Sequence, residues 1–199
     1  MKFSFNTLFA VTLWSSLSFM GVNADEGLFD GDKIGWEYFS DAEIDPWYLP
    51  GSATSSSSGK EGSVDVGENR LRCGIVPYDE HGNIWMVAAK KDFEDVGFIL
   101  PKGGYDDTKD SDFWDCVKRE GMEEGGLVIY FDDMTPLGMT DKRSVYWFKA
   151  IVRETSGTGE SRPALPRTFN VANAREELKK PRDNHKKKAS MRRALWETT

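Results

Sequence analysis

The 199-residue chain is predicted to form an α/β sandwich, and two patterns carry that prediction. Short segments rich in β-branched and aromatic residues, bounded by Gly, Pro, Asn and Asp, recur from residue 70 to residue 152, as strands do. One internal segment and the C-terminal segment have helical spacing instead. Strands interleaved with helices in this way form a sheet with the internal helix packed against it.

The first 24 residues differ from the rest of the chain. Lys2 gives a positive start, an apolar run diluted by serines follows, and Val22-Asn23-Ala24 is the small-residue ending that signal peptidase accepts. A membrane-spanning helix would need an uninterrupted apolar stretch of about 20 residues, which is missing. We therefore interpret residues 1–24 as a secretory signal peptide and expect no membrane contact in the mature form.

Residues 25–69 are expected to be an arm in two parts. Residues 25–50 are acidic and aromatic, and such a segment either packs over the domain or binds a partner; packing is favoured because exposed aromatic side chains are costly. Residues 51–69 are rich in Ser and Gly and have the composition of a flexible linker. The folded domain is expected to occupy residues 70–199.

Within that domain the elements follow one another closely. The expected strands are residues 70–78, 83–90, 97–101, 127–131 and 143–152, and the expected helices are residues 112–124, 172–180 and 187–196. A Gly- and Asp-rich loop, residues 102–110, precedes the first helix. Asp110, Ser111 or Asp112 is expected to cap that helix, and Gly125-Gly126 to end it.

Charge is distributed unevenly along the chain. The net charge is −7, but residues 161–199 hold 11 Lys and Arg against 4 Asp and Glu. An acidic body with a basic tail argues against general coating of nucleic acid and for local capture of anions. The run from Asn184 to Arg193 either steers an anionic substrate or is a solvated helix face.

Only two cysteines are present, Cys73 and Cys116, and the sequence leaves open whether they pair. Small secreted domains often need several disulfides, whereas a domain of this size can be stable through its core alone. The low number of cysteines therefore has two interpretations: the protein is secreted but works in a reducing cytosol, or its core is stable enough without several disulfides.

Three glutamates share one face of the first predicted helix. Glu120, Glu123 and Glu124 stand at i, i+3 and i+4, so their charges repel and require compensation. Three carboxylates in this arrangement form an oxygen site suited to Mg²⁺ or Mn²⁺. Such an ion polarises a phosphoryl group and supplies hydroxide as a nucleophile.

The segment "GGYDDTKDSDFWDCVKREGMEEGGL" resembles the Nudix box. The core of that motif is Arg-Glu, an apolar or small residue, any residue, Glu-Glu, any residue, Gly and an aliphatic residue, and residues 119–127 fit it if Gly121 is the small residue. With "FILPKGG" before it, the resemblance covers about residues 70–196. It implies an α/β/α sandwich with a mixed sheet, a pyrophosphohydrolase, and Mg²⁺ or Mn²⁺ as cofactor.

The resemblance also implies roles for individual residues. Glu120, Glu123 and Glu124 would be metal ligands, and one of the three would also serve as general base. Arg119 would orient a glutamate. Gly103 and Gly104 would let the backbone approach the metal and the substrate. The sequence departs from the motif at one point: Ser111 stands where an upstream glutamate belongs, and Asp107, Asp110 or Asp112 could replace it.

The substrate is less well defined than the reaction. The cations expected to meet phosphates are Lys102, Lys142, Arg143 and Arg167, although each alone is more often a surface charge. "PKGG", Gly121 and the basic tail resemble Nudix enzymes that hydrolyse diphosphoinositol polyphosphates, dinucleoside polyphosphates or the mRNA 5′ cap. The acidic body disfavours a diphosphoinositol, and aromatic residues suit a cationic cap base, namely Trp85, Phe98, Trp147 and Phe169.

A secreted Nudix enzyme with few cysteines also resembles the effectors of plant-pathogenic fungi. This resemblance implies delivery into the cytoplasm of a host cell. An alternative of another class is an inactive Nudix fold that binds a host protein through residues 25–50. The complete glutamate set favours the enzyme, because a binding module would not need it.

Overall fold

The computed structural model describes residues 53–56, 61–139, 144–157, 159–180 and 186–199. The predicted signal peptide and aromatic arm lie outside the described residues. So do two of the cations expected to bind substrate, Lys142 and Arg143.

The core of the fold is a seven-stranded sheet. Its main path has the order β10-β5-β4-β9-β8, β6 pairs with β5, and β7 pairs with β4. The strands are β4 (Arg72–Tyr78), β5 (Ile84–Ala88), β6 (Phe98–Ile99), β7 (Lys102–Gly104), β8 (Leu127–Met139), β9 (Val145–Thr155) and β10 (Arg167–Phe169). Because β4 and β9 are parallel and the other pairs antiparallel, the sheet is mixed, which confirms the prediction.

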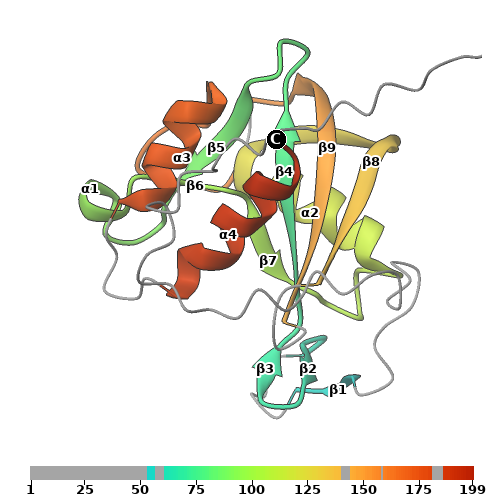
Figure 1. Ribbon diagram of the computed structural model, residues 1–199. Helices are drawn as coiled ribbons and strands as arrows, with labels where there is room; N and C mark the ends of the chain where they lie inside the picture. The colour runs from blue at the N-terminus through green and yellow to red at the C-terminus, as the bar shows by residue number, and fades with distance from the viewer. Residues whose placement is uncertain (1–52, 57–60, 140–143, 158, 181–185) are drawn as a thin grey trace, which may run out of the picture. The chain divides into compact units, whose positions relative to one another are not determined.

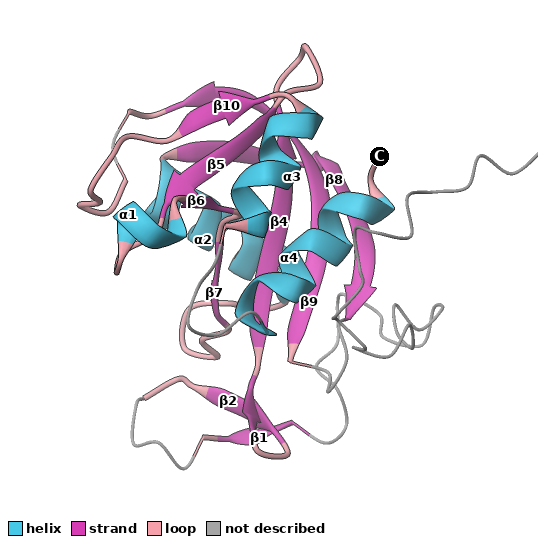
Figure 2. Ribbon diagram, turned by 60° about the vertical axis from the view of Figure 1, so that its left-hand side comes forward, coloured by secondary structure: helices cyan, strands magenta, loops and turns pink. Residues whose placement is uncertain are grey.

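Helices cover both faces of this sheet. Figures 1 and 2 show α2 (Phe113–Gly125) on one face, and α3 (Val171–Lys179) and α4 (Lys186–Glu197) on the other. Two apolar clusters fill the layers: one joins Phe113 and Val117 to Phe148, and the other joins Leu178 and Leu195 to the sheet. The α/β/α sandwich is therefore confirmed. The short helix α1 (Phe93–Val96) was not predicted.

Local signals determine where α2 begins and ends. The Asp112 side chain accepts a hydrogen bond from the backbone N–H of Asp115 at 2.9 Å and caps the first turn. Gly126 has a left-handed conformation, with φ of 61°, and its N–H bonds back to Met122 O at 2.8 Å. The predicted helix and its glycine stop are thus confirmed.

The segment predicted as a flexible linker forms strands within its described residues, 53–56 and 61–69, so the prediction is wrong there. It contains three short strands that pair in the order β1-β2-β3: β1 (Ala53–Ser55), β2 (Val64–Val66) and β3 (Asn69–Arg70). Val64 and Val66 alternate with Asp65, and both valines are buried in the cluster beneath α2. The Ser- and Gly-rich composition concealed this short alternation.

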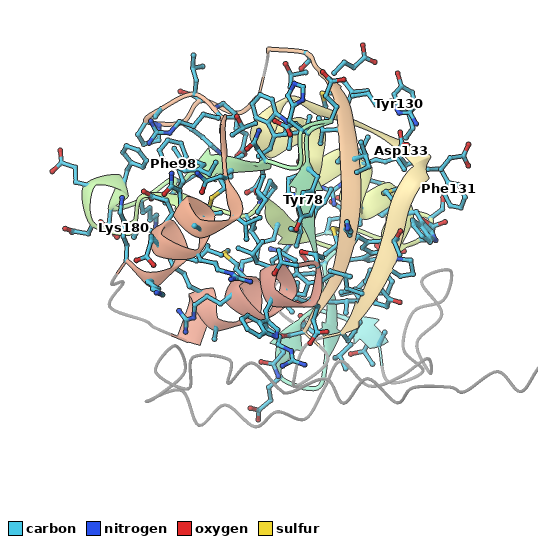
Figure 3. The ribbon with its side chains drawn as sticks, turned by 45° about the horizontal axis from the view of Figure 1, so that its top comes forward. Tyr78, Phe98, Tyr130, Phe131, Asp133 and Lys180 are labelled. Carbon is cyan, nitrogen blue, oxygen red and sulfur yellow. A yellow bond between two sulfur atoms is a disulfide. The ribbon has the colours of Figure 1, made fainter. Side chains whose placement is uncertain are left out.

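Two other expectations are corrected by the sheet. The predicted loop at residues 102–110 begins as β7, in which Gly103 pairs with Cys73. The strand expected at residues 127–131 extends to residue 139 as one long strand, β8. Its register against β9 is irregular between Ile129 and Met134, and Tyr130 and Phe131 are exposed on that stretch (Figure 3).

Cys73 and Cys116 form a disulfide, which answers a question that the sequence left open. The bond joins β4 to α2, and both cysteines are fully buried. No helix among the described residues is long and apolar enough to cross a membrane.

The basic tail is more than a solvated face. The Lys188 side chain is buried, and its ammonium donates to Val96 O at 2.6 Å and to Glu177 O at 2.9 Å. The second bond reaches a carbonyl in the last turn of α3, where a cation is favoured. Lys188 therefore fastens α4 to its neighbours.

Candidate active site

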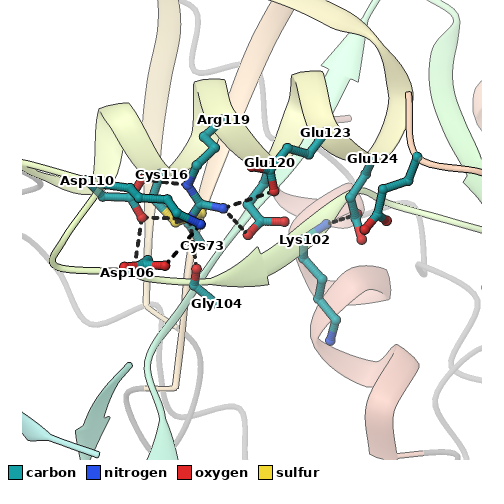
Figure 4. Close-up of polar contacts among 12 residues, drawn as sticks. Cys73, Lys102, Gly104, Asp106, Asp110, Cys116, Arg119, Glu120, Glu123 and Glu124 are labelled. Atoms are coloured by element: carbon teal, nitrogen blue, oxygen red, sulfur yellow. Dashed lines mark hydrogen bonds and ion pairs between the residues drawn. A yellow bond between two sulfur atoms is a disulfide. The ribbon is translucent and has the colours of Figure 1, made fainter. Parts of the chain in front are cut away.

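The three glutamates of α2 form a row in which only the middle one is strongly exposed (Figure 4). The Glu120 side chain is 11% exposed, that of Glu123 is 48% exposed, and that of Glu124 is 13% exposed. Glu124 is largely buried because the loop after β9 covers it, whereas Glu123 is half exposed.

Arg119 holds one end of the glutamate row. Its guanidinium donates to Glu120 Oε1 at 2.7 Å and to Glu123 Oε2 at 3.2 Å. The same group donates to both Asp110 oxygens, at 2.7 and 2.6 Å, and to Gly104 O at 2.8 Å. Paired, charge-assisted bonds of this kind fix a guanidinium in one orientation.

Of the three aspartates that could replace the upstream glutamate, Asp110 is the one whose carboxylate pairs with Arg119. The Asp110 side chain is fully buried and also accepts from the backbone N–H of Asp106 at 2.9 Å. Asp112 caps the helix instead. The bond to Asp110 raises the pKa of Arg119 above its usual range, so Arg119 remains a cation.

The backbone of β7 lies directly against the Glu120 carboxylate. A Cβ built on Gly103 would overlap that carboxylate, so only glycine fits there while Glu120 keeps this position. Cys116, one turn before Glu120, is tied by the disulfide to Cys73, the register partner of Gly103. The disulfide therefore fastens the helix to the sheet beside this contact.

Arg162 holds the other end of the row, and sequence reasoning missed it. Its side chain is 2% exposed and donates to Glu124 Oε1 at 2.5 Å and to Ala88 O at 2.6 Å. The other Glu124 oxygen accepts from the backbone N–H of Lys102 at 2.7 Å. A single arginine in a Pro- and Gly-rich loop, 38 residues from its partner, gives no local signal.

The loop that carries Arg162 is fastened to the end of α2. The N–H of Glu160 donates to Glu123 O at 2.6 Å, and the N–H of Ser156 donates to Gly126 O at 2.7 Å. These bonds use carbonyl groups that a helix leaves unpaired at its C-terminus. The loop therefore helps to position the glutamate row.

Burial alters the protonation of the row. It raises the pKa of Glu124 to about 6, against the opposing effect of Arg162, and it raises the pKa of Glu120. Both carboxylates would be stabilised as anions by a nearby cation. Perturbed carboxylates of this kind are typical of functional sites.

The residues present fit a divalent ion in chemistry. The three carboxylates supply oxygen ligands of the type that Mg²⁺ and Mn²⁺ prefer. Gly103 has no side chain, so the backbone lies close to the Glu120 carboxylate. In this conformation the carboxylates bind Arg119 and Arg162. Accordingly, within the described part of the chain, no three acidic, His or Cys side chains converge as a ready ligand set.

The predicted substrate-binding residues do not all meet at the row. Lys102 bonds to Glu124 through its backbone N–H, and Gly104 binds Arg119 through its carbonyl. Arg167 lies over the rings of Phe98 and Phe169, at 4.2 and 4.9 Å, so it packs against aromatic side chains.

A cavity of about 500 Å³ opens beside Glu124. Of the four aromatic residues expected near the substrate, Trp85 lines this cavity, whereas Trp147 is fully buried and Phe98 lies beneath Arg167. The cavity is lined by Trp85, Glu124, Gly125, Thr155, Gly157, Gly159, Glu160, Ser161, Arg162, Ala164, Leu165 and Pro166.

One known family model matches most of the folded part of this chain. The family model described as "NUDIX domain" matches residues 68–194. A search of curated proteins returned no significant match.

Among solved structures, the chain is similar to the NUDIX domain of Shewanella oneidensis NrtR, complexed with ADP ribose, with 18% identity over 62% of this chain and 85% of that one and a TM-score of 0.46. It is also similar to an Ap4A hydrolase of C. elegans, with 20% identity over 64% of this chain and 93% of that one and a TM-score of 0.43. Similarity at this level assigns no substrate.

Proposed function

The chain belongs to the NUDIX domain family, a family of hydrolases, and from this membership we propose that it hydrolyses a phosphoanhydride bond in the 5′ cap of mRNA. The observation that carries the choice of substrate is the cavity beside Glu124. It combines an aromatic residue, Trp85, with apolar residues and two carboxylates, Glu124 and Glu160, and contains one cation, Arg162. A cap supplies a cationic, planar base that suits such a site.

A diphosphoinositol polyphosphate suits this cavity less well. Its many phosphates require a cluster of cations, and the one arginine that lines the cavity is already paired with a carboxylate. The diphosphoinositol reading therefore ranks second, and it would need cations from elsewhere in the chain.

The residues have separate roles in the proposed reaction. Glu120, Glu123 and Glu124 would hold the divalent ion, which supplies positive charge to the phosphate oxygens and lowers the pKa of an attacking water. Arg119 orients Glu120 and Glu123. Glu123, the most exposed of the three carboxylates, is the group we assign to accept a proton from water.

A substrate panel tests this proposal. The purified protein with Mg²⁺ is offered capped RNA, a diphosphoinositol polyphosphate, a dinucleoside polyphosphate and ADP-ribose. We expect the highest kcat/KM on capped RNA, and the identity of the products shows which bond is cut. A preference for the diphosphoinositol would overturn the proposal, and no turnover of any of the four would favour the inactive binding fold.

We further propose that the protein is secreted and works inside a host cell. The leader-like residues 1–24 and the Cys73–Cys116 disulfide support secretion, since disulfides form in oxidising compartments. A phosphoanhydride substrate of the cap type supports an intracellular site of action. Retention of the native protein in the secretory pathway of its own cell would contradict this proposal.

A further inference from the structure

The first two strands of the small sheet, β1 and β2, lie outside the NUDIX domain match, which begins at residue 68. They are nevertheless part of the folded unit. Val64 and Val66 are 3% and 7% exposed and belong to the same apolar cluster as Phe113 of α2. The backbone N–H of Leu71 donates to Val64 O at 2.8 Å. This chain has therefore added a short N-terminal segment to the domain and buried it beneath the helix that carries the glutamate row.

The residues just before β2 hold the loop that joins β7 to α2. The backbone N–H of Asp107 donates to Gly62 O at 2.8 Å, and Ser63 forms an isolated antiparallel bridge with Asp106. Ser63 and Asp106 are both buried, at 3% and 6% exposed. A Cβ built on Gly62 would overlap the Asp106 carboxylate, so the two residues are in close contact. The N-terminal segment therefore determines where Asp106 lies.

Asp106 in turn holds Asp110. The backbone N–H of Asp106 donates to Asp110 Oδ2 at 2.9 Å, and Asp106 O accepts from the N–H of Asp110 at 2.7 Å (Figure 4). The Tyr105 hydroxyl donates to Asp110 O at 2.8 Å. These bonds close the loop into a turn in which the Asp110 carboxylate meets the guanidinium of Arg119.

We propose that the segment before β2, Gly62 and Ser63, positions the glutamate row for hydrolysis. The contacts form one continuous path: this segment holds Asp106, Asp106 holds Asp110, and Asp110 holds Arg119, which orients the glutamates. A loop rich in Gly and Asp has few apolar side chains to hold it by burial, so it needs such external support. The inference rests on hydrolysis at the row, as in the proposed function, but not on the choice of substrate.

Gly62→Ala tests the path, because it displaces Asp106 and leaves every group between Asp106 and the glutamates unchanged. Gly67→Ala, in the turn between β2 and β3, is the matched control. Both glycines have a left-handed backbone, with φ of 73° and 60°, so alanine is strained to a similar degree at each. A Cβ built on Gly67 meets no atom within 4 Å. The two variants therefore differ in the contact with Asp106.

The first measurement is steady-state turnover of the full-length variants with Mg²⁺ on the best substrate of the panel. In Gly62→Ala we expect kcat to fall by about 10- to 100-fold, as when the groups that orient metal ligands are disturbed. KM should change by less than about threefold, because the path ends at the carboxylates and not in the cavity. Gly67→Ala should keep both values. An equal loss in the two variants, or a raised KM with unchanged kcat, would overturn the proposal.

The second measurement does not depend on turnover. Arg119 Nε–H donates to Asp110 Oδ1 at 2.7 Å, and its exchange with solvent is followed by ¹⁵N NMR, the signal being identified by its loss in Arg119→Lys. We expect exchange about tenfold faster in Gly62→Ala than in the wild type or in Gly67→Ala. This result would support the path even if the wild type hydrolyses none of the four substrates. Unchanged exchange in folded Gly62→Ala would overturn it even if capped RNA is hydrolysed.

The wild type alone decides the matter if Gly62→Ala does not fold. The amide of Asp107, which donates to Gly62 O, reports opening of the N-terminal segment. If that segment positions Arg119, its opening also frees Arg119 Nε–H, so the arginine should be protected from exchange no more than about tenfold better than the amide. Much stronger protection of Arg119 would show that the segment opens without releasing it, and would overturn the proposal.

Discussion

The two ends of the glutamate row are both held by arginine, but in different ways. Arg119 is fixed by groups outside the row, because Asp110 and Gly104 receive three of its hydrogen bonds. Arg162 has one bond to the scaffold, at Ala88 O, and its other partners are the carboxylates of Glu124 and Glu160. Arg119 is therefore held mainly by groups outside the row, whereas Arg162 is held mainly by the carboxylates whose charge it neutralises.

This difference has a consequence for ligand binding. With a cation bound to the row, Arg119 would still have Asp110 and Gly104 as partners. Arg162 would lose its main charge partner and become available to an anionic or hydrogen-bonding ligand in the adjacent cavity. We therefore expect the Arg119 end to govern stability and the Arg162 end to govern binding.

Removing the anchor of Arg119 should have the largest effect on folding. Asp110→Asn removes the fully buried counter-charge of Arg119 and leaves it only Glu120 and Glu123 as charged partners, and breaking a buried pair costs about 3–5 kcal/mol. Urea denaturation would measure this loss.

Asp112→Asn is the matched control for that variant, because asparagine caps a helix about as well as aspartate. It should change the free energy of unfolding by less than about 0.5 kcal/mol. If the two variants are equally stable, Asp110 is not the anchor of Arg119.

The disulfide beside the Arg119 end should be the next largest contribution. Cys73→Ala combined with Cys116→Ala opens a loop with a sequence separation of 43 residues, and the loop-entropy relation gives a loss of about 4 kcal/mol. Equilibrium unfolding of this variant against the oxidised wild type would measure it. A variant as stable as the wild type would show that the bond does not support the helix–sheet contact.

The Arg162 end should show a smaller effect that depends on pH. The pKa of Glu124 is raised from 4.5 to about 6, so the folded protein binds more protons than the unfolded chain between these values. Stability of the metal-free protein should therefore fall by about 2 kcal/mol from this group as pH rises from 4 to 7.

Glu124→Gln isolates that effect, since it lacks the titrating group. The part of the substitution's effect that does not depend on pH is the same at pH 4 and pH 7. The free energy of unfolding is therefore measured for both proteins at each pH, and the difference between them at pH 4 is compared with the difference at pH 7. The wild type should lose stability relative to the variant as pH rises. A difference that does not change with pH would contradict the burial of a carboxylate at this end.

The same two ends show what could be predicted from the sequence. The helix and its glycine stop are predictable, and the cap is narrowed to three neighbouring residues that include Asp112, because these signals are local. The choice of Asp110 among three nearby aspartates depends on how the loop from Asp106 folds back on itself, which composition does not encode.

Arg162 and its loop could not be found in this way. The residue pairs with Glu124 across 38 positions, and only the course of β8 and β9 brings them together. The ordering of Val64 and Val66 was missed for a related reason, since two valines in a Ser- and Gly-rich segment gain their burial from the cluster beneath α2. Local patterns pointed to the glutamate row, and long-range contacts form the cavity beside it.

If the glutamate row carries out metal-dependent hydrolysis, Glu123→Gln is the substitution that tests this role most directly. Glu123 is half exposed and has one 3.2 Å bond to Arg119, so the variant should fold with a stability within about 0.5 kcal/mol of the wild type. We predict that Mg²⁺-dependent turnover of the best substrate falls by about 100-fold or more, whereas the exposed control Glu176→Gln keeps it. A folded Glu123→Gln protein with undiminished turnover would contradict the account.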